Sequence, residues 1–163
     1  MGIGSSRKSR KLEVLLWSIA FPGFGQLLNG KYIKGILLIT LEILVNVMGN
    51  FNKIIILSFN FQIEEAIAAT DYMWLMFYPC LYFFAIWDAY KDAGGGMDES
   101  FSYLPLVFSA YFVTIGLILS SEFTFFGYLI GPIWLPVIFL PVGLGIGIII
   151  RKTLLEKYSN ENV

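Results

Sequence analysis

The sequence predicts an all-α integral membrane protein with about four transmembrane helices and an N-terminal re-entrant or interfacial hairpin. The chain of 163 residues is 57% hydrophobic and 14% charged, and its mean hydropathy is +0.73. Globular domains are about 45–50% apolar and about 25% charged. Four apolar runs approach the roughly 20 residues that a spanning helix needs. The polar stretches between them are short, so we expect one membrane domain, residues 13–150.

The N-terminal residues 1–12 carry a cluster of Lys and Arg, and we interpret them as a basic cytoplasmic segment. The first apolar core runs only from Val14 to Trp17 before a polar residue follows. A secretory signal has about 7–15 apolar residues at this place. We therefore expect the N-terminus to be retained.

Residues 14–30 are predicted to form the hairpin, because their apolar run is too short and too broken for a straight crossing. Fifteen residues, 14–28, would span only about 22 Å as a helix, whereas the bilayer core is about 30 Å thick. Pro22, Gly23 and Gly25 interrupt the run. Proline removes a backbone donor and glycine loosens a helix.

The placement of basic residues distinguishes a full crossing from a hairpin, since Lys and Arg collect in cytoplasmic loops. A hairpin that enters and returns leaves ten of the eleven Lys and Arg residues inside and only Lys53 outside. A full crossing divides them five against six. The hairpin is therefore preferred, and both termini, including the tail 151–163, are predicted to be cytoplasmic.

Irregular backbone at membrane depth must be shielded by protein or water. We therefore expect the hairpin to pack against the spans, with Gln26 and Asn29 supplying hydrogen bonds. Lys31 and Lys34 follow directly and are expected to extend to the cytoplasmic headgroups.

The expected spans are taken from the apolar runs and from the aromatic residues that flank them, since Trp and Tyr favour the membrane interface. The segment between the first and second spans mixes apolar residues with acids and amides, which is typical of an amphipathic extracytoplasmic helix. The spans are predicted at residues 35–50, 72–90, 104–121 and 127–150, and the amphipathic segment at 51–71.

Glu42 lies inside the first expected span, and an ionisable group at membrane depth is a functional candidate. Asn46 follows four residues later, on the same helical face. One interpretation is a proton- or cation-responsive site that faces the bundle. The other is a buried polar pair that fixes helix packing through hydrogen bonds.

Asp88 and Asp92 are also four residues apart, at the cytoplasmic end of the second expected span. Paired carboxylates at this spacing are a weak candidate for a divalent metal site. The alternative is a solvated helix end at which Lys91 balances the acids. Cys80 lies in an apolar run, where a thiol is a poor nucleophile, and we interpret it as a core residue.

Gly143 and Gly147 form a Gly-x-x-x-Gly spacing in the last expected span. Small residues at this spacing let two helices approach closely, within one chain or between chains. We expect them to serve packing inside the chain.

Composition excludes several functional classes. The chain has no His, which common membrane lipid phosphatases and rhomboid-like proteases require, and it has no Gly-x-Gly-Asp sequence of intramembrane aspartyl proteases. One Cys and no His leave no Cys/His metal cluster. A net charge of −1 gives no basic field for nucleic acid. We expect no cofactor.

The stretch "PGFGQLLNGKYIKG" places Gly25, Gln26, Gly30 and Gly35 in a glycine-rich turn. It resembles small bacterial membrane proteins with a Pro-Gly-x-Gly-Gln-x-Tyr-x-Gly signature, which are distantly similar to the two-transmembrane-helix domain family. Leu28 stands where that signature has Tyr. "AIWDAYKDA" resembles the aspartate-containing end of the helix that closes such modules. The resemblance implies a membrane hairpin in a bacterial plasma membrane and implies no reaction.

We therefore expect a small polytopic membrane protein that is not an enzyme and that acts by association in the bilayer, with a membrane-protein partner or a second copy. The first alternative is a proton- or cation-linked transporter or channel that uses Glu42. The second is a metal-dependent enzyme on lipid headgroups that uses Asp88 and Asp92.

Overall fold

The computed structural model describes residues 3–96 and 100–161, and it is mostly helical with one small antiparallel β-hairpin. In the hairpin, Thr124 pairs with Leu129 and Phe125 with Tyr128. The elements in chain order are α1 (Ile3–Ala20), α2 (Phe24–Leu28), α3 (Tyr32–Met48), α4 (Phe51–Phe59), α5 (Ile63–Ala69), α6 (Tyr72–Leu75), α7 (Tyr78–Asp92), α8 (Leu104–Leu119), β1 (Thr124–Phe125), β2 (Tyr128–Leu129) and α9 (Gly131–Glu161).

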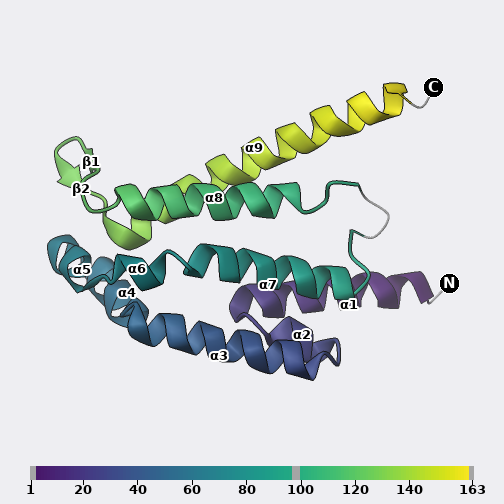
Figure 1. The fold of residues 1–163 in the computed structure, drawn as a ribbon, viewed down its shortest axis with the longest axis horizontal. Helices are drawn as coiled ribbons and strands as arrows, with labels where there is room; N and C mark the ends of the chain where they lie inside the picture. The colour runs from purple at the N-terminus through teal and green to yellow at the C-terminus, as the bar shows by residue number, and fades with distance from the viewer. Residues whose placement is uncertain (1–2, 97–99, 162–163) are drawn as a thin grey trace.

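The long helices α3, α7, α8 and α9 run back and forth between two ends of an elongated molecule (Figure 1). One end holds α4, α5, α6 and the β-hairpin, and both ends of the chain lie at the opposite end. The most extensive helix contact is between α8 and α9. Contacts between α7 and α8 are fewer, so α8 and α9 form a helical hairpin set against the rest of the chain.

The chain turns back on itself between α1 and α3 (Figure 1). α1 ends at Ala20, and Gly23 has a φ of 99°, a left-handed conformation that favours glycine. α2 then packs against α1, and α3 starts at the end of the molecule where the N-terminus lies.

Two element boundaries differ from the sequence-based expectation near the N-terminus and in the second apolar run. α1 begins at Ile3, so the expected basic tail is helical. The expected helix 72–90 is divided into α6 and α7, because Asp71 caps the short α6 and Pro79 lies in the first turn of α7. Proline is tolerated there because the first turn has no intrahelical partner for its missing N–H.

The last apolar run also differs from the expectation. The expected helix 127–150 begins later, because β2 occupies its start, and α9 then continues unbroken through the expected tail. Gly131–Ser159 is the one helix of the described residues that is by itself long and apolar enough to cross a membrane. Only 22% of its most apolar window is buried, whereas a core helix of a soluble protein is mostly buried.

The segment that follows α3 contributes to the core of the molecule. α4 continues from α3 after a bend of 60°, and the two helices together pass the length and hydropathy test for a span. Ile54 of α4 and Ala66 of α5 are fully buried against Leu75 and Leu117. The amphipathic segment therefore packs its apolar face on the ends of α6 and α8.

Two glycines of α9, Gly143 and Gly147, lie against α8 at close range. A Cβ on Gly143 would lie 2.5 Å from the carbonyl oxygen of Phe108, and one on Gly147 would lie 2.6 Å from the Cα of Pro105. Gly145, on another face of the helix, has no heavy atom within 4 Å of such a Cβ. The Gly-x-x-x-Gly spacing therefore faces α8 inside the chain.

This difference gives a matched pair of substitutions. We expect Gly147→Ala to destabilise the fold by about 1–3 kcal/mol, because the helices must separate or shift to admit the methyl group. Gly145→Ala should leave stability unchanged or raise it by up to about 1 kcal/mol, because Ala favours helix over Gly. Thermal unfolding in detergent, followed by circular dichroism, measures both. Equal effects of the two substitutions would contradict the packing described here.

Candidate functional site

The side chain of Gln26 joins the short helix α2 to α7. It is fully buried, and its Nε2 donates to the carbonyl oxygen of Ala85 at 2.9 Å and to Oδ2 of Asp88 at 3.1 Å. A buried amide that lost these partners would carry the full cost of desolvation. Gln26 therefore fixes the position of α2 on α7.

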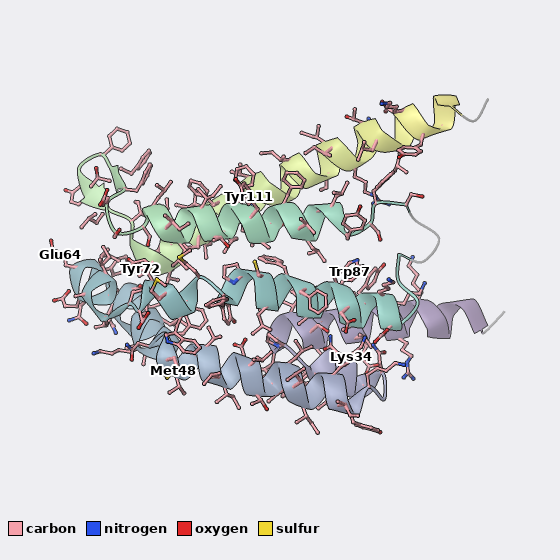
Figure 2. All side chains as sticks on the ribbon, viewed as in Figure 1. Lys34, Met48, Glu64, Tyr72, Trp87 and Tyr111 are labelled. Carbon is pink, nitrogen blue, oxygen red and sulfur yellow. The ribbon has the colours of Figure 1, made fainter. Side chains whose placement is uncertain are left out.

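Two side chains that follow Gln26 in the chain, those of Asn29 and Lys34, also contact α7. Asn29 Nδ2 donates to the carbonyl oxygen of Ala89 at 2.8 Å. Lys34 Nζ, at the start of α3, contacts Asp88 Oδ1 at 2.7 Å and Asp92 Oδ2 at 3.1 Å. Figure 2 shows Lys34 at the end of the molecule that carries both termini. We call this set the polar cluster: Gln26, Asn29, Lys34, Asp88 and Asp92.

The glycine-rich sequence of the turn allows the close approach that the polar cluster needs. A Cβ on Gly25 would overlap the Ser18 hydroxyl of α1 and would lie 2.8 Å from Cβ of Ala89 on α7. A Cβ on Gly35 would lie 2.5 Å from Leu27. α2 is thus wedged between α1, α3 and α7, and only small residues fit at these points.

The end of α1 is tied to α7 by a separate hydrogen bond. The hydroxyl of Tyr82 donates to the carbonyl oxygen of Ile19 at 2.6 Å. The last carbonyl groups of a helix have no intrahelical partner, and Pro22, which is fully buried, has no N–H to supply one. Tyr82 thus satisfies a backbone group in the first turn of the chain reversal.

The ion pairs of the polar cluster are also hydrogen bonds. Lys34 Nζ donates to Oδ1 of Asp88 and to Oδ2 of Asp92. Because half of the Lys34 side chain is exposed, solvent screens the pair.

Lys34 is half exposed, and both carboxylates hold its ammonium group. One expectation for the acids was wrong. Lys91 does not balance the acids, since its Nζ lies 4.8 Å from the ring centroid of Trp87. The described residues contain no group of three potential metal ligands among His, Cys, Asp and Glu. A divalent ion between Asp88 and Asp92 would have to displace Lys34.

Glu42 is buried on α3, away from the polar cluster, with 4% of its surface exposed. Its carboxyl group lies beside Tyr78 of α7, and Oε2 has no hydrogen-bond partner within the described part of the chain. Asn46 Nδ2 donates instead to Asn52 Oδ1 of α4 at 3.3 Å. Glu42 and Asn46 do not contact one partner helix: Asn46 is bonded to α4, whereas Glu42 lies beside α7.

The polar cluster joins the two segments that carry the family resemblance, residues 15–35 and 84–93, although about 60 residues separate its partners. The role of Lys34 was missed in the sequence. Its signal was the acid pair Asp88 and Asp92 on one helical face, which calls for a cation from another helix. No protein-family model, curated protein or solved structure matches this chain.

Replacing Gln26 tests how much the polar cluster contributes to the stability of the fold. We expect Gln26→Ala to lower the free energy of unfolding by about 1–3 kcal/mol, since it leaves buried polar groups unpaired. The exposed Gln62 is the matched control, and Gln62→Ala should change stability by no more than about 0.5 kcal/mol. Lys34→Gln should cost no more than about 1 kcal/mol, because the pair is partly exposed. Unfolding in detergent measures all three, and a Gln26→Ala value as small as that of Gln62→Ala would contradict the role given to Gln26.

Proposed function

We propose that this chain is a multi-pass membrane protein that acts by association with another membrane component and not by catalysis. The observation that carries the membrane assignment is the exposure of large apolar side chains along the long helices, beside an interior that holds polar as well as apolar side chains. The fully or nearly fully buried polar residues are Ser18, Gln26, Glu42, Ser58, Ser109 and Ser120.

The outward faces of the long helices are apolar in three separate places of the fold. Exposed residues of this kind include Ile36, Ile43 and Val47 on α3, Val107, Tyr111 and Ile118 on α8, and Val137, Val142, Ile148 and Ile149 on α9. Monomeric soluble proteins rarely expose large contiguous apolar surfaces. Lipid is the solvent in which such faces carry no cost.

The proposed topology has α3 with α4, α6 with α7, α8 and α9 as the spans, and α1 with α2 as a re-entrant hairpin. The basic residues support it, because those of α1, of the start of α3, of the end of α7 and of the end of α9 belong to one end of the molecule, while Lys53 lies on α4 at the other. This is the asymmetry that the cytoplasmic side of a membrane protein carries. In this topology both termini are cytoplasmic.

Association is favoured over catalysis by the state of the ionisable groups. The two clustered carboxylates, Asp88 and Asp92, are bound to Lys34. The surface between α7 and α8, by contrast, is hollowed and apolar. A hollow apolar surface at membrane depth is suited to bind a lipid or a helix of another chain.

Cysteine labelling tests the topology. In a Cys80→Ala background, we place single cysteines at four exposed positions, Lys31, Asn60, Thr124 and Ser159. An impermeant thiol reagent applied to intact cells should label the cysteines at 60 and 124 only, because α4 and the β-hairpin lie at the extracytoplasmic end. Permeabilised cells should show labelling at all four positions.

Each other labelling pattern has a definite meaning. Labelling at 31 in intact cells would make α1 a true crossing and would overturn the hairpin. Protein that is released from membranes by alkaline carbonate would overturn the membrane assignment itself, before any topology is considered.

The second candidate function is proton- or cation-linked transport through Glu42. The observation that favours it is the carboxyl oxygen Oε2 of Glu42, which is buried and has no hydrogen-bond partner within the described residues. Ionisable groups at membrane depth are costly and commonly mark ion pathways. Tyr78 of α7, which lies beside this carboxyl group, would then orient it.

Transport by Glu42 predicts a flux. Purified protein in sealed vesicles should collapse a pH gradient faster than empty vesicles, and Glu42→Gln, which keeps the shape of the side chain, should abolish the excess. Asn46→Ala is the control for a polar residue of α3 that bonds elsewhere, and it should keep the flux. A gradient that decays equally in all samples assigns Glu42 to packing alone.

A further inference from the structure

A groove of about 820 Å³ lies between α7 and α8. Its volume is within the range of small-molecule sites, about 300–1,000 Å³. The walls are apolar over most of their length, formed by Phe83, Phe84 and Trp87 from α7 and by Leu106, Val107 and Ala110 from α8. Trp87 and Tyr111, which both line the groove, are labelled on the two helices in Figure 2. Val107 and Phe84 are more than half exposed, so the groove is open on its outer side.

One end of the groove is positively charged. Lys91 lines it close to the C-terminal end of α7, and Tyr103 lines it just before α8 begins. Lys91 Nζ lies over the Trp87 ring. Within the described part of the chain, Lys91 makes no ion pair, because Asp88 and Asp92 of the same helix are bound to Lys34 from α3. Among the described residues, no carboxylate therefore neutralises the cation that faces the groove.

We propose that this groove binds one anionic phospholipid, with an acyl chain along the apolar walls and the phosphate at Lys91. The inference rests on the proposed membrane topology, in which Lys91, Trp87 and Tyr103 lie at the cytoplasmic headgroup level. Basic pockets between helices on this side bind anionic headgroups, and Trp and Tyr favour this depth.

A phospholipid fits both parts of the groove within one molecule. Its chain requires the apolar length, and its phosphate requires the cation at the end. A helix of another chain would fill the apolar length but would have to bring an acid to the level of Lys91. The charge complementarity therefore favours a lipid over a protein in the groove. This lipid is then the membrane component with which the chain is proposed to associate.

Native mass spectrometry tests the proposal on the full chain. The protein is reconstituted in vesicles of phosphatidylcholine and phosphatidylglycerol in equal amounts and then released into mild detergent. We expect one retained lipid, with phosphatidylglycerol favoured over phosphatidylcholine by about fivefold, the effect of one lysine near a membrane surface. Lys91→Gln should bring this ratio to about one, while Lys152→Gln, which removes an exposed charge from α9 at the same end, should leave it unchanged.

A second variant separates the groove from the charge. Val107→Phe adds bulk at an exposed position of the wall, so the fold should tolerate it, and it should reduce the retention of both lipids. Equal retention of the two lipids by the unaltered chain, or loss of preference in Lys152→Gln as well, would overturn the lipid site. A dimer mass without lipid would do the same, because it would show a second copy in the groove. Failure of the protein to float with the vesicles would instead overturn the proposed membrane insertion.

Discussion

The fold depends on the burial of one amide, the side chain of Gln26, against the backbone of α7. Two donors from one nitrogen hold α2 to Ala85 and Asp88. Because α2 is only five residues long, its own backbone hydrogen bonds cannot stabilise it. Without this contact, α2 would not be held against α7, and the start of α3, which follows α2, would not be held in place either.

The surface of α7 is divided into two faces with different contacts. One face carries the carboxylates that bind Lys34, and its backbone accepts from Gln26 and Asn29. The other face carries Trp87 and Lys91 towards α8. Asp88 lies three residues before Lys91 and Asp92 directly follows it. Because Lys34 holds both acids, Lys91 is left to face the groove.

Much of the helical architecture could be predicted from the sequence, because its causes are local. Apolar runs specify the long helices, and Pro22, Gly23 and Gly25 specify a turn wherever they occur in a short run. The division of the second run into α6 and α7 depends on Asp71 and Pro79, which a hydropathy average conceals. The partners of Lys34 were beyond prediction, because the contact joins positions 54 and 58 residues apart and needs the tertiary fold.

The hairpin of α8 and α9 meets the rest of the molecule largely through α7, and two hollows of the structure lie along α7. α8 and α9 approach each other without gaps, because Gly116, Gly143 and Gly147 remove side chains from their contact. The residues of α7 that face them are aromatic, including Tyr82, Phe83 and Trp87. Rigid rings cannot interdigitate with a helical hairpin as closely as small residues do. Small residues therefore let α8 and α9 pack closely, whereas the aromatic residues of α7 leave a groove between α7 and α8.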